Sequence, residues 1–250
     1  MRSLVLVVSM LFGASLARAD NQITVSVAAS FRDVIQTIAD DFRREHPHVT
    51  VTFNFGGSGA LARQIEDGAP VDVFLSAGRP EIDRLREKGL VAGEPVVVAR
   101  NRLVVVVPAA SPWIGKPPRD LLASPELRRI ALGDPASVPF GAYAKQALTT
   151  AGLWDAVPPK AVFAADVRQA LTYADDGSVD AAVVYATDAR VAKSAKAIGE
   201  MPGAKDLEIE AVAVRLERST AGAAARFLTH LASPAARKAL TDAGFLPPGP

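Results

Sequence analysis

Apolar runs rich in β-branched residues alternate along this chain with stretches whose apolar residues recur at helical spacing. ITVSVAA is followed by SFRDVIQTIADDFRREH, in which one helical face holds Val34, Ile35, Ile38, Ala39 and Phe42. VTVTFNF and VDVFLSA are also followed by helical patterns, and later apolar runs are RLVVVVP, RRIAL, AVFAA and VDAAVVY. Alternating strands and helices predict an α/β fold with mostly parallel, buried strands.

The length allows one large domain or two smaller lobes. The chain shows no internal repeat and no single Pro/Gly-rich linker that would divide it. Two lobes can still form if strands cross between them. The stretch VVVARNRLVVVVP suits such a crossing, because only Arg100, Asn101 and Arg102 interrupt two long apolar runs.

The first residues have the pattern of a secretory signal peptide. A positively charged start, MR, precedes an uncharged apolar run at 4–16, and residues 17–19 read ARA, an A-x-A cleavage site. The run is shorter than the roughly 20 apolar residues of a transmembrane helix. We therefore expect residues 1–19 to be removed on export and the soluble mature chain to begin at Asp20.

Composition argues against several classes of function. Without the signal peptide the chain has 26 Lys and Arg against 27 Asp and Glu, so we expect no nucleic-acid or anionic-membrane partner. It has no Cys, three His and no HExxH motif, so we expect no disulfide, protein-bound metal ion or cofactor. His46 and His48 flank a Pro in a predicted solvated turn, and His230 lies in a late predicted helix.

The turn GGSGALARQ, residues 56–64, lies between a predicted strand and a predicted helix. It lacks the Lys followed by Ser or Thr of a nucleotide-binding P-loop. It places Ser58 after its strand, and three other strand-to-helix turns present Ser30, Phe140 and Val167. Ligands of open α/β sheets bind at the carboxyl ends of the strands, where free N–H groups and helix dipoles favour an anion. These four turns predict an anion site.

None of the four turns has a Lys, Arg or His at these positions. Neutral hydroxyl and N–H donors suit a fully ionised oxyanion, since a buried cation would cost desolvation. We interpret Asp166, the nearest carboxylate, as a helix N-cap, and Ser30 and Ser58 taken alone also suit N-caps. A serine hydrolase needs a His base near one of these serines, and the chain has no GxSxG motif, so an exported α/β hydrolase is a less favoured alternative.

Six stretches stand in an informative order: VAASF, FGGSGALARQIEDGAPVDVFLSAG, ALGDPASVPFGAYAKQAL, DVRQAL, VVYATDA and the C-terminal FLTHLASPAARKALTDAGF. Together they resemble the periplasmic molybdate-binding proteins of ABC transporters, which are type II periplasmic solute-binding proteins. The resemblance covers nearly the whole mature chain. Each stretch is a weak signal by itself, whereas the six in this order and spacing are a strong one.

The resemblance implies two α/β lobes joined by a hinge, with the ligand cleft between them. Residues 20–99 together with about 205–250 would form lobe 1, and 100–204 would form lobe 2. Molybdate, and also tungstate, would be the transported ligand of a non-enzymatic receptor. The resemblance further implies a periplasmic monomer that delivers the anion to a membrane permease with a separate ATPase subunit. A receptor for sulfate, phosphate or an organic anion remains an alternative.

Matching the motifs residue by residue implies five ligand-binding residues. Ser30 and Ser58 would donate from lobe 1, each through its hydroxyl and backbone N–H. Phe140 and Val167 would donate backbone N–H groups from lobe 2, and Tyr185 in VVY its phenol hydroxyl. Taken alone, Tyr185 also suits a core tyrosine with an internal partner. Family members often have Ala at the position of Phe140, whose side chain can change the shape of the cavity or the lip of the cleft.

Overall fold

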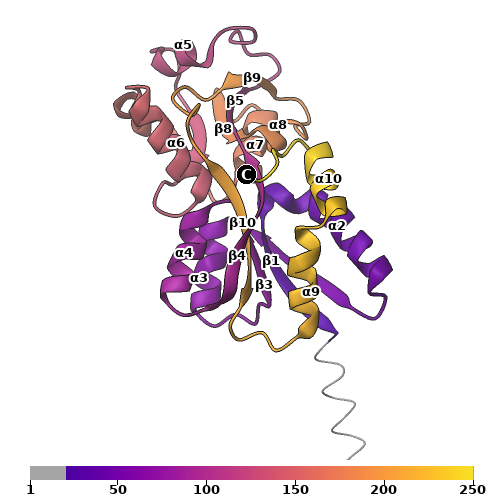
Figure 1. The fold of residues 1–250 in the computed structure, drawn as a ribbon. Coiled ribbons are helices and arrows are strands. Elements are labelled where there is room, and N and C mark those ends of the chain that lie inside the picture. Colours follow the sequence, from indigo (N-terminus) through magenta and orange to yellow (C-terminus); the bar gives the residue numbers. More distant parts are fainter. Residues whose placement is uncertain (1–20, 250) are drawn as a thin grey trace, which may run out of the picture.

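The computed structural model describes residues 21–249, so the predicted signal peptide at 1–19 lies outside the described residues. Two five-stranded sheets organise this part of the chain (Figure 1). The first has the strand order β2-β1-β3-β10-β4, and the second has the order β7-β6-β8-β5-β9. Helices pack against both sheets, which confirms the predicted fold of two α/β units.

The strands of the first sheet are β1 (Gln22–Ala28), β2 (Thr50–Gly56), β3 (Val73–Ser76), β4 (Val91–Asn101) and β10 (Ile209–Leu216). Those of the second are β5 (Leu103–Val107), β6 (Ile130–Gly133), β7 (Ala161–Ala164), β8 (Ala181–Tyr185) and β9 (Lys196–Glu200). The α-helices are α2 (Arg32–Glu45), α3 (Ser58–Glu66), α4 (Arg79–Glu87), α5 (Pro118–Ala123), α6 (Pro139–Thr150), α7 (Val167–Asp175), α8 (Ala186–Ala189), α9 (Gly222–Leu231) and α10 (Pro234–Asp242). Short 3-10 helices are η1 (Ala29–Phe31), η2 (Trp154–Ala156) and η3 (Pro158–Lys160).

The sheets are mixed, although most strands share one direction, as expected: four of the five strands in each sheet run the same way, and β10 in the first sheet and β5 in the second run against them. β1 pairs in parallel with β2 and β3, and β6 pairs in parallel with β7 and β8. In contrast, β10 is antiparallel to β3 and β4, and β5 is antiparallel to β8 and β9. The antiparallel pairs all involve strands that lie next to the connections between the two sheets. The direction of these strands is therefore set by how the chain passes between the sheets, and a pattern of apolar residues does not encode that path.

The chain passes between the sheets twice. β4 ends at Asn101 and β5 begins at Leu103, so Arg102 alone separates a strand of one sheet from a strand of the other, within the predicted crossing. The return runs from the end of β9 to the start of β10. At the first crossing the Asn101 side chain donates to the hydroxyl of Thr187 at 2.9 Å. The lobe boundaries at 99/100 and near 204/205 remain predictions.

Helices cover both faces of the first sheet. α3 and α4 pack on one face, and α2 and α9 pack on the other, with α10 against α2 (Figure 1). The five apolar residues predicted to share one face of α2 are all buried in the main core. A smaller core lies under α3 and α4 and includes Leu61, Ile65 and Phe74. The sheet is thereby covered on both faces. The carboxyl ends of β1, β2, β3 and β4 point toward the second sheet, and β10 runs the other way.

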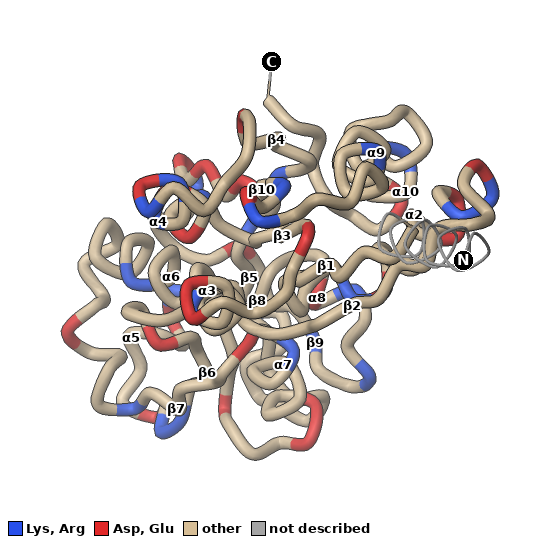
Figure 2. Tube along the Cα trace, turned by 90° about the horizontal axis from the view of Figure 1, so that it is seen from below, with Lys and Arg blue, Asp and Glu red and all other residues tan. Residues whose placement is uncertain are grey.

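Charged residues are interspersed on the outside of the molecule. α4, for example, carries both basic and acidic residues, and both signs recur along the described trace (Figure 2). Among the described residues, no helix combines the length and apolarity that a membrane span requires.

Candidate anion site

A small cavity lies between the two sheets, and all five predicted site residues line it. The volume of the cavity is about 20 Å³. The full lining is Ala28, Ala29, Ser30, Gly56, Gly57, Ser58, Ala77, Val138, Pro139, Phe140, Asp166, Val167 and Tyr185. Pockets for drug-sized molecules are about 300 to 1,000 Å³. A cavity this small fits an ion or a ligand of a few atoms.

Ser30 and Ser58 are buried at the ends of β1 and β2, where each strand turns into a helix. The interpretation of both as N-caps is wrong, because Ser30 lies inside η1, Ser58 is the first residue of α3, and neither makes a capping bond. The Ser58 hydroxyl oxygen accepts the backbone N–H of Ala77 at 3.1 Å, which leaves its hydrogen free to donate. The buried Ser30 hydroxyl has no hydrogen-bond partner in the described part of the chain.

Phe140 and Val167 lie in the first turns of α6 and α7, where backbone N–H groups have no partner within the helix. The predicted N-cap role of Asp166 is confirmed: one carboxylate oxygen accepts the N–H groups of Arg168 at 2.9 Å and Gln169 at 3.0 Å. Val167 lies between Asp166 and Arg168, and its backbone N–H does not take part in this cap. Both helix N-termini add positive potential at the cavity.

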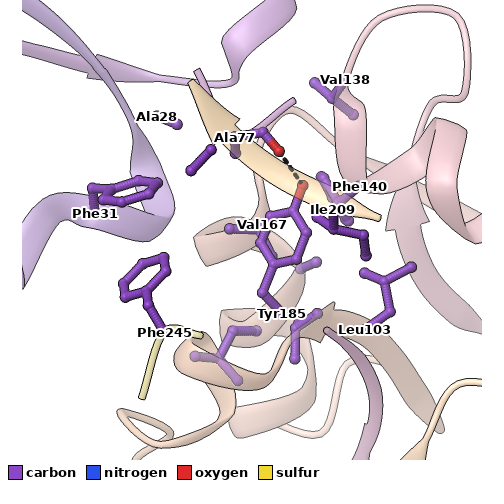
Figure 3. Packing of buried hydrophobic residues seen from close by; sticks show 14 of the residues in the cluster. Ala28, Phe31, Ala77, Leu103, Val138, Phe140, Val167, Tyr185, Ile209 and Phe245 are labelled. Atoms are coloured by element: carbon purple, nitrogen blue, oxygen red, sulfur yellow. Dashed lines mark hydrogen bonds between the residues drawn. The ribbon is translucent and has the colours of Figure 1, made fainter. Parts of the chain in front are cut away.

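The side chain of Phe140 is buried in the cavity wall and does not form a lip. Its ring centroid lies 6.4 Å from that of Tyr185 in an edge-on arrangement (Figure 3). It also covers Gly133, where an added Cβ would come within 2.8 Å of the Phe140 ring. The expectation that this side chain changes the shape of the cavity therefore applies to its inner wall.

The first half of the molecule is the part built on the first sheet, and the second half is the part built on the second sheet. Tyr185 ends β8 in the second half and connects the two halves. Its hydroxyl donates to the carbonyl oxygen of Ala77 at 3.3 Å, across from the second sheet to the first (Figure 3). Burial raises the pKa of the Tyr185 phenol well above its ordinary value, so the group stays a neutral donor. The internal partner matches the alternative of a core tyrosine. To bind an anion, the hydroxyl would have to turn from Ala77 to the ligand.

Glycines allow the two halves to touch beside the cavity. A Cβ on Gly59 would lie 1.8 Å from the carbonyl oxygen of Ser137, and a Cβ on Gly57 would lie 2.3 Å from that of Ala165. Both oxygens belong to backbone of the opposite half, which cannot move aside as a side chain would. The GGSG turn is therefore required for this close contact, in addition to placing Ser58.

The cavity lining contains no Lys, Arg or His among the described residues. An anion there would be held by hydroxyl groups, backbone N–H groups and helix termini. The same lining offers no imidazole base beside Ser30 or Ser58, so the arrangement lacks the Ser–His pair of a hydrolase. Chemically, the site can bind a compact hydrogen-bond acceptor.

A separate cluster on the first half combines Asp41, Glu45 and His230, whose possible ligand atoms lie within 4.8 Å of one another. His230 Nε2 lies 3.4 Å from an Asp41 oxygen, and Nδ1 lies 3.6 Å from a Glu45 oxygen. Each ring nitrogen thus faces a different carboxylate.

Comparison with known proteins places the chain in a family. The family model described as bacterial extracellular solute-binding protein matches residues 23–246. The chain belongs to this family. Within it, the molybdate-binding protein ModA of Haemophilus influenzae is 35% identical over 231 residues, which cover 91% of each chain. The resemblance to molybdate-binding proteins seen in the sequence motifs is confirmed.

Solved structures of solute-binding proteins share this fold. The periplasmic molybdate-binding protein of Azotobacter vinelandii has a TM-score of 0.78 at 27% identity, covering 91% of this chain and 100% of that one. The sulfate-binding protein SubI of Mycobacterium tuberculosis H37Rv has a TM-score of 0.79 at 22% identity, covering 92% and 88%. The fold is thus common to proteins named for different oxyanions, and it does not choose between them.

Sequence reasoning missed a group of charges next to the cavity of this solute-binding protein. Arg168 follows Val167 directly, and its guanidinium contacts Asp33 and Asp188. Asp33 lies 135 residues away in the chain, on the other half of the molecule. The motif DVRQAL shows the Arg, yet no local pattern identifies its distant partner.

Proposed function

We propose that this protein is a receptor that captures molybdate, and also tungstate, and delivers it to an ABC transporter permease. The observation that carries the proposal is the convergence of Ser30, Ser58, Phe140, Val167 and Tyr185 on one small cavity between two α/β units. These residues come from five separate segments of the chain. The motif match to molybdate-binding proteins selects the same five, which supports their role as ligand donors.

The chemistry of the cavity supports an anion that carries no proton. Each hydroxyl and N–H in the proposed set can donate to an oxygen of a tetrahedral dianion, and the buried Ser30 hydroxyl has no other partner. A hydrogen phosphate ion would also need an acceptor for its own proton. Asp166 is the carboxylate in the lining, and one of its oxygens already accepts two N–H groups of α7.

Discrimination against sulfate must rest on size in this proposal. Molybdate and sulfate are both tetrahedral dianions that offer only acceptors, so the same donors suit either one. The buried ring of Phe140 forms part of the wall that sets the size of the cavity. A receptor for sulfate is therefore the alternative within the same class. The sulfate-binding protein SubI, which shares this fold, is an example of such a receptor.

Further parts of the proposal concern location and partners. Residues 1–19 would direct export to the periplasm, and the mature protein would act there as a monomer. Residues 20–99 with about 205–250 would form one lobe, and 100–204 the other. ATP hydrolysis would come from a separate subunit, because the glycine-rich turn at 56–64 lacks the Lys of a P-loop.

Isothermal titration of the mature protein, freed of any co-purified anion, tests the proposal. Molybdate, tungstate, sulfate and phosphate are added in turn. Tight binding of the first two with one site per chain, and no heat from the others, is the expected result. Tight binding of sulfate alone would identify the alternative receptor. Absence of binding by all four anions would contradict the proposed function.

A further inference from the structure

Arg168 forms an ion pair that joins the two halves of the molecule. It lies in the first turn of α7, and its terminal nitrogen donates to an Asp33 oxygen on α2 at 2.7 Å. α2 packs against the first sheet and α7 against the second. Among the side-chain ion pairs of the described residues, this is the one whose members belong to different halves. The pair can form only when the halves are close together.

A second acid holds the guanidinium ready for this contact. Arg168 Nε donates to an oxygen of Asp188, which lies on α8 in the same half and is fully buried. Because both residues belong to the second half, their contact does not depend on closure. The arginine is therefore ordered in advance, and Asp33 is the group that is gained or lost when the halves move.

The ion pair lies beside the cavity without being part of its lining. A neighbouring hollow of about 240 Å³ includes Asp33 and Arg168 and shares Ser30 with the cavity. Arg168 directly follows the proposed donor Val167, and Asp188 lies on the short helix after the proposed donor Tyr185. Movement of α7 relative to α2 would therefore change this pair and the anion site together.

We propose that the Asp33–Arg168 pair is a latch that holds the two halves closed and so sets how slowly the bound anion leaves. The inference rests on the proposed function for its ligand. Neither side chain needs to touch the anion. An interaction present in the closed form and absent from the open form shifts the population toward closed, and it slows release more than it changes capture.

The cleanest change is Asp33→Asn. Substituting Arg168 would leave the buried carboxylate of Asp188 without its partner and would destabilise the fold. Asp33 is 61% exposed as a side chain, so its amide variant leaves the core intact. Asp40→Asn is the matched control, since Asp40 lies on the same helix and pairs only with Arg43 of that helix. Asp33→Glu tests whether a carboxylate of different length restores the latch.

Stopped-flow measurement of molybdate capture and release provides the readout. Asp33→Asn is expected to speed release by about twofold to fivefold, with capture changed by less than about twofold. Asp40→Asn should match the wild type, and Asp33→Glu should fall between the wild type and the amide. Added salt should speed release from the wild type and have little effect on Asp33→Asn. Release from Asp33→Asn at the wild-type rate would overturn the latch and leave the proposed function standing.

Small-angle scattering without added anion tests the latch separately from the proposed receptor function. The ion pair between Asp33 and Arg168 favours the closed form whether or not an anion is bound. The radius of gyration of Asp33→Asn should therefore be larger than that of the wild type and larger than that of Asp40→Asn. If the wild type binds none of the four anions, the proposed function fails. The latch then stands if Asp33→Asn is the more extended protein, and it fails if the three proteins scatter alike.

Discussion

The hydroxyl of Ser58 has a structural contact in addition to its proposed role in binding the anion. Its oxygen accepts the Ala77 N–H, and Ala77 in turn offers its carbonyl oxygen to Tyr185 from the opposite half. Ser58 therefore holds the end of β3 at the position where the two halves meet. Ser30, in contrast, has no such bond, and its hydroxyl is free for a ligand.

Ser58→Ala should weaken molybdate binding by about tenfold to a hundredfold, because a hydrogen bond to a charged group contributes roughly 1.5 to 3 kcal/mol. Isothermal titration measures the change. Ser178→Ala is the control, since Ser178 is exposed in a turn at the far end of α7. A thermal melt without anion reports how much the lost Ala77 contact matters for folding. Equal affinity in Ser58→Ala and the wild type would remove this residue from the site.

Glu81, in the first turn of α4, is a buried acid with an oxygen that has no hydrogen-bond partner. Burial raises the pKa of its carboxyl to about 7. The folded state thus holds this proton more strongly than the unfolded state, whose carboxyl has a pKa near 4.5. The contribution of Glu81 to stability is fully present below about pH 4.5 and is lost as the pH rises to about 7.

Glu81→Gln should therefore stabilise the protein at pH 8 by about 1 to 3 kcal/mol and leave its stability at pH 5 nearly unchanged. Thermal melts at the two pH values measure the difference. Glu87→Gln, on the exposed side of the same helix, should behave like the wild type at both. A destabilised Glu81→Gln protein at pH 8 would show that the carboxylate is stabilised by contacts that outweigh its burial.

At the scale of the element, α3 is a contact surface between the halves and, in the proposed function, also carries a ligand donor. Its N-terminus presents Ser58 to the cavity, and the absence of a side chain at Gly59 lets its first turn approach the backbone at Ser137. The motif GGSG indicates the turn that presents Ser58 but does not reveal the close contact, because in a sequence such glycines can equally reflect a need for positive φ. The structure separates these two explanations, because neither Gly57 nor Gly59 has a positive φ.

Gly59→Ala should prevent full closure and lower molybdate affinity by at least about tenfold, because the new Cβ would meet a backbone oxygen at 1.8 Å. The melting temperature without anion should not fall if the halves can separate, since Ala is the better helix former by about 1 kcal/mol. Isothermal titration measures the loss of affinity, and a thermal melt without anion measures any change in stability. Unchanged affinity would mean that tight contact between α3 and the second half is not needed for binding.

The whole molecule is expected to close around its ligand, since the proposed donors come from both halves. Saturation with molybdate should decrease the radius of gyration by a few per cent of roughly 17 Å, the size expected for a compact chain of this length. Small-angle scattering of the anion-free and saturated protein measures this change. Identical scattering curves would contradict closure on binding.

Much of this architecture can be predicted from the sequence, for identifiable reasons. Strands and helices alternate in period, so the α/β class follows. The turns after β1 and β2 and before α6 and α7 point to four of the residues that line the cavity. Tyr185 came from the family motif alone, because a tyrosine at the end of an apolar strand has the pattern of a core residue. Strand direction and the Asp33–Arg168 contact depend on how distant segments meet, which local patterns do not encode.

The order of strands in the first sheet also governs when that sheet can be completed. β10 lies between β3 and β4, yet it is the last strand in the chain. During synthesis, β4 therefore emerges before the strand that joins it to β3, whereas all strands of the second sheet have been made by residue 200. The second half can therefore form first, and the first half is completed only when residues 209–216 become available.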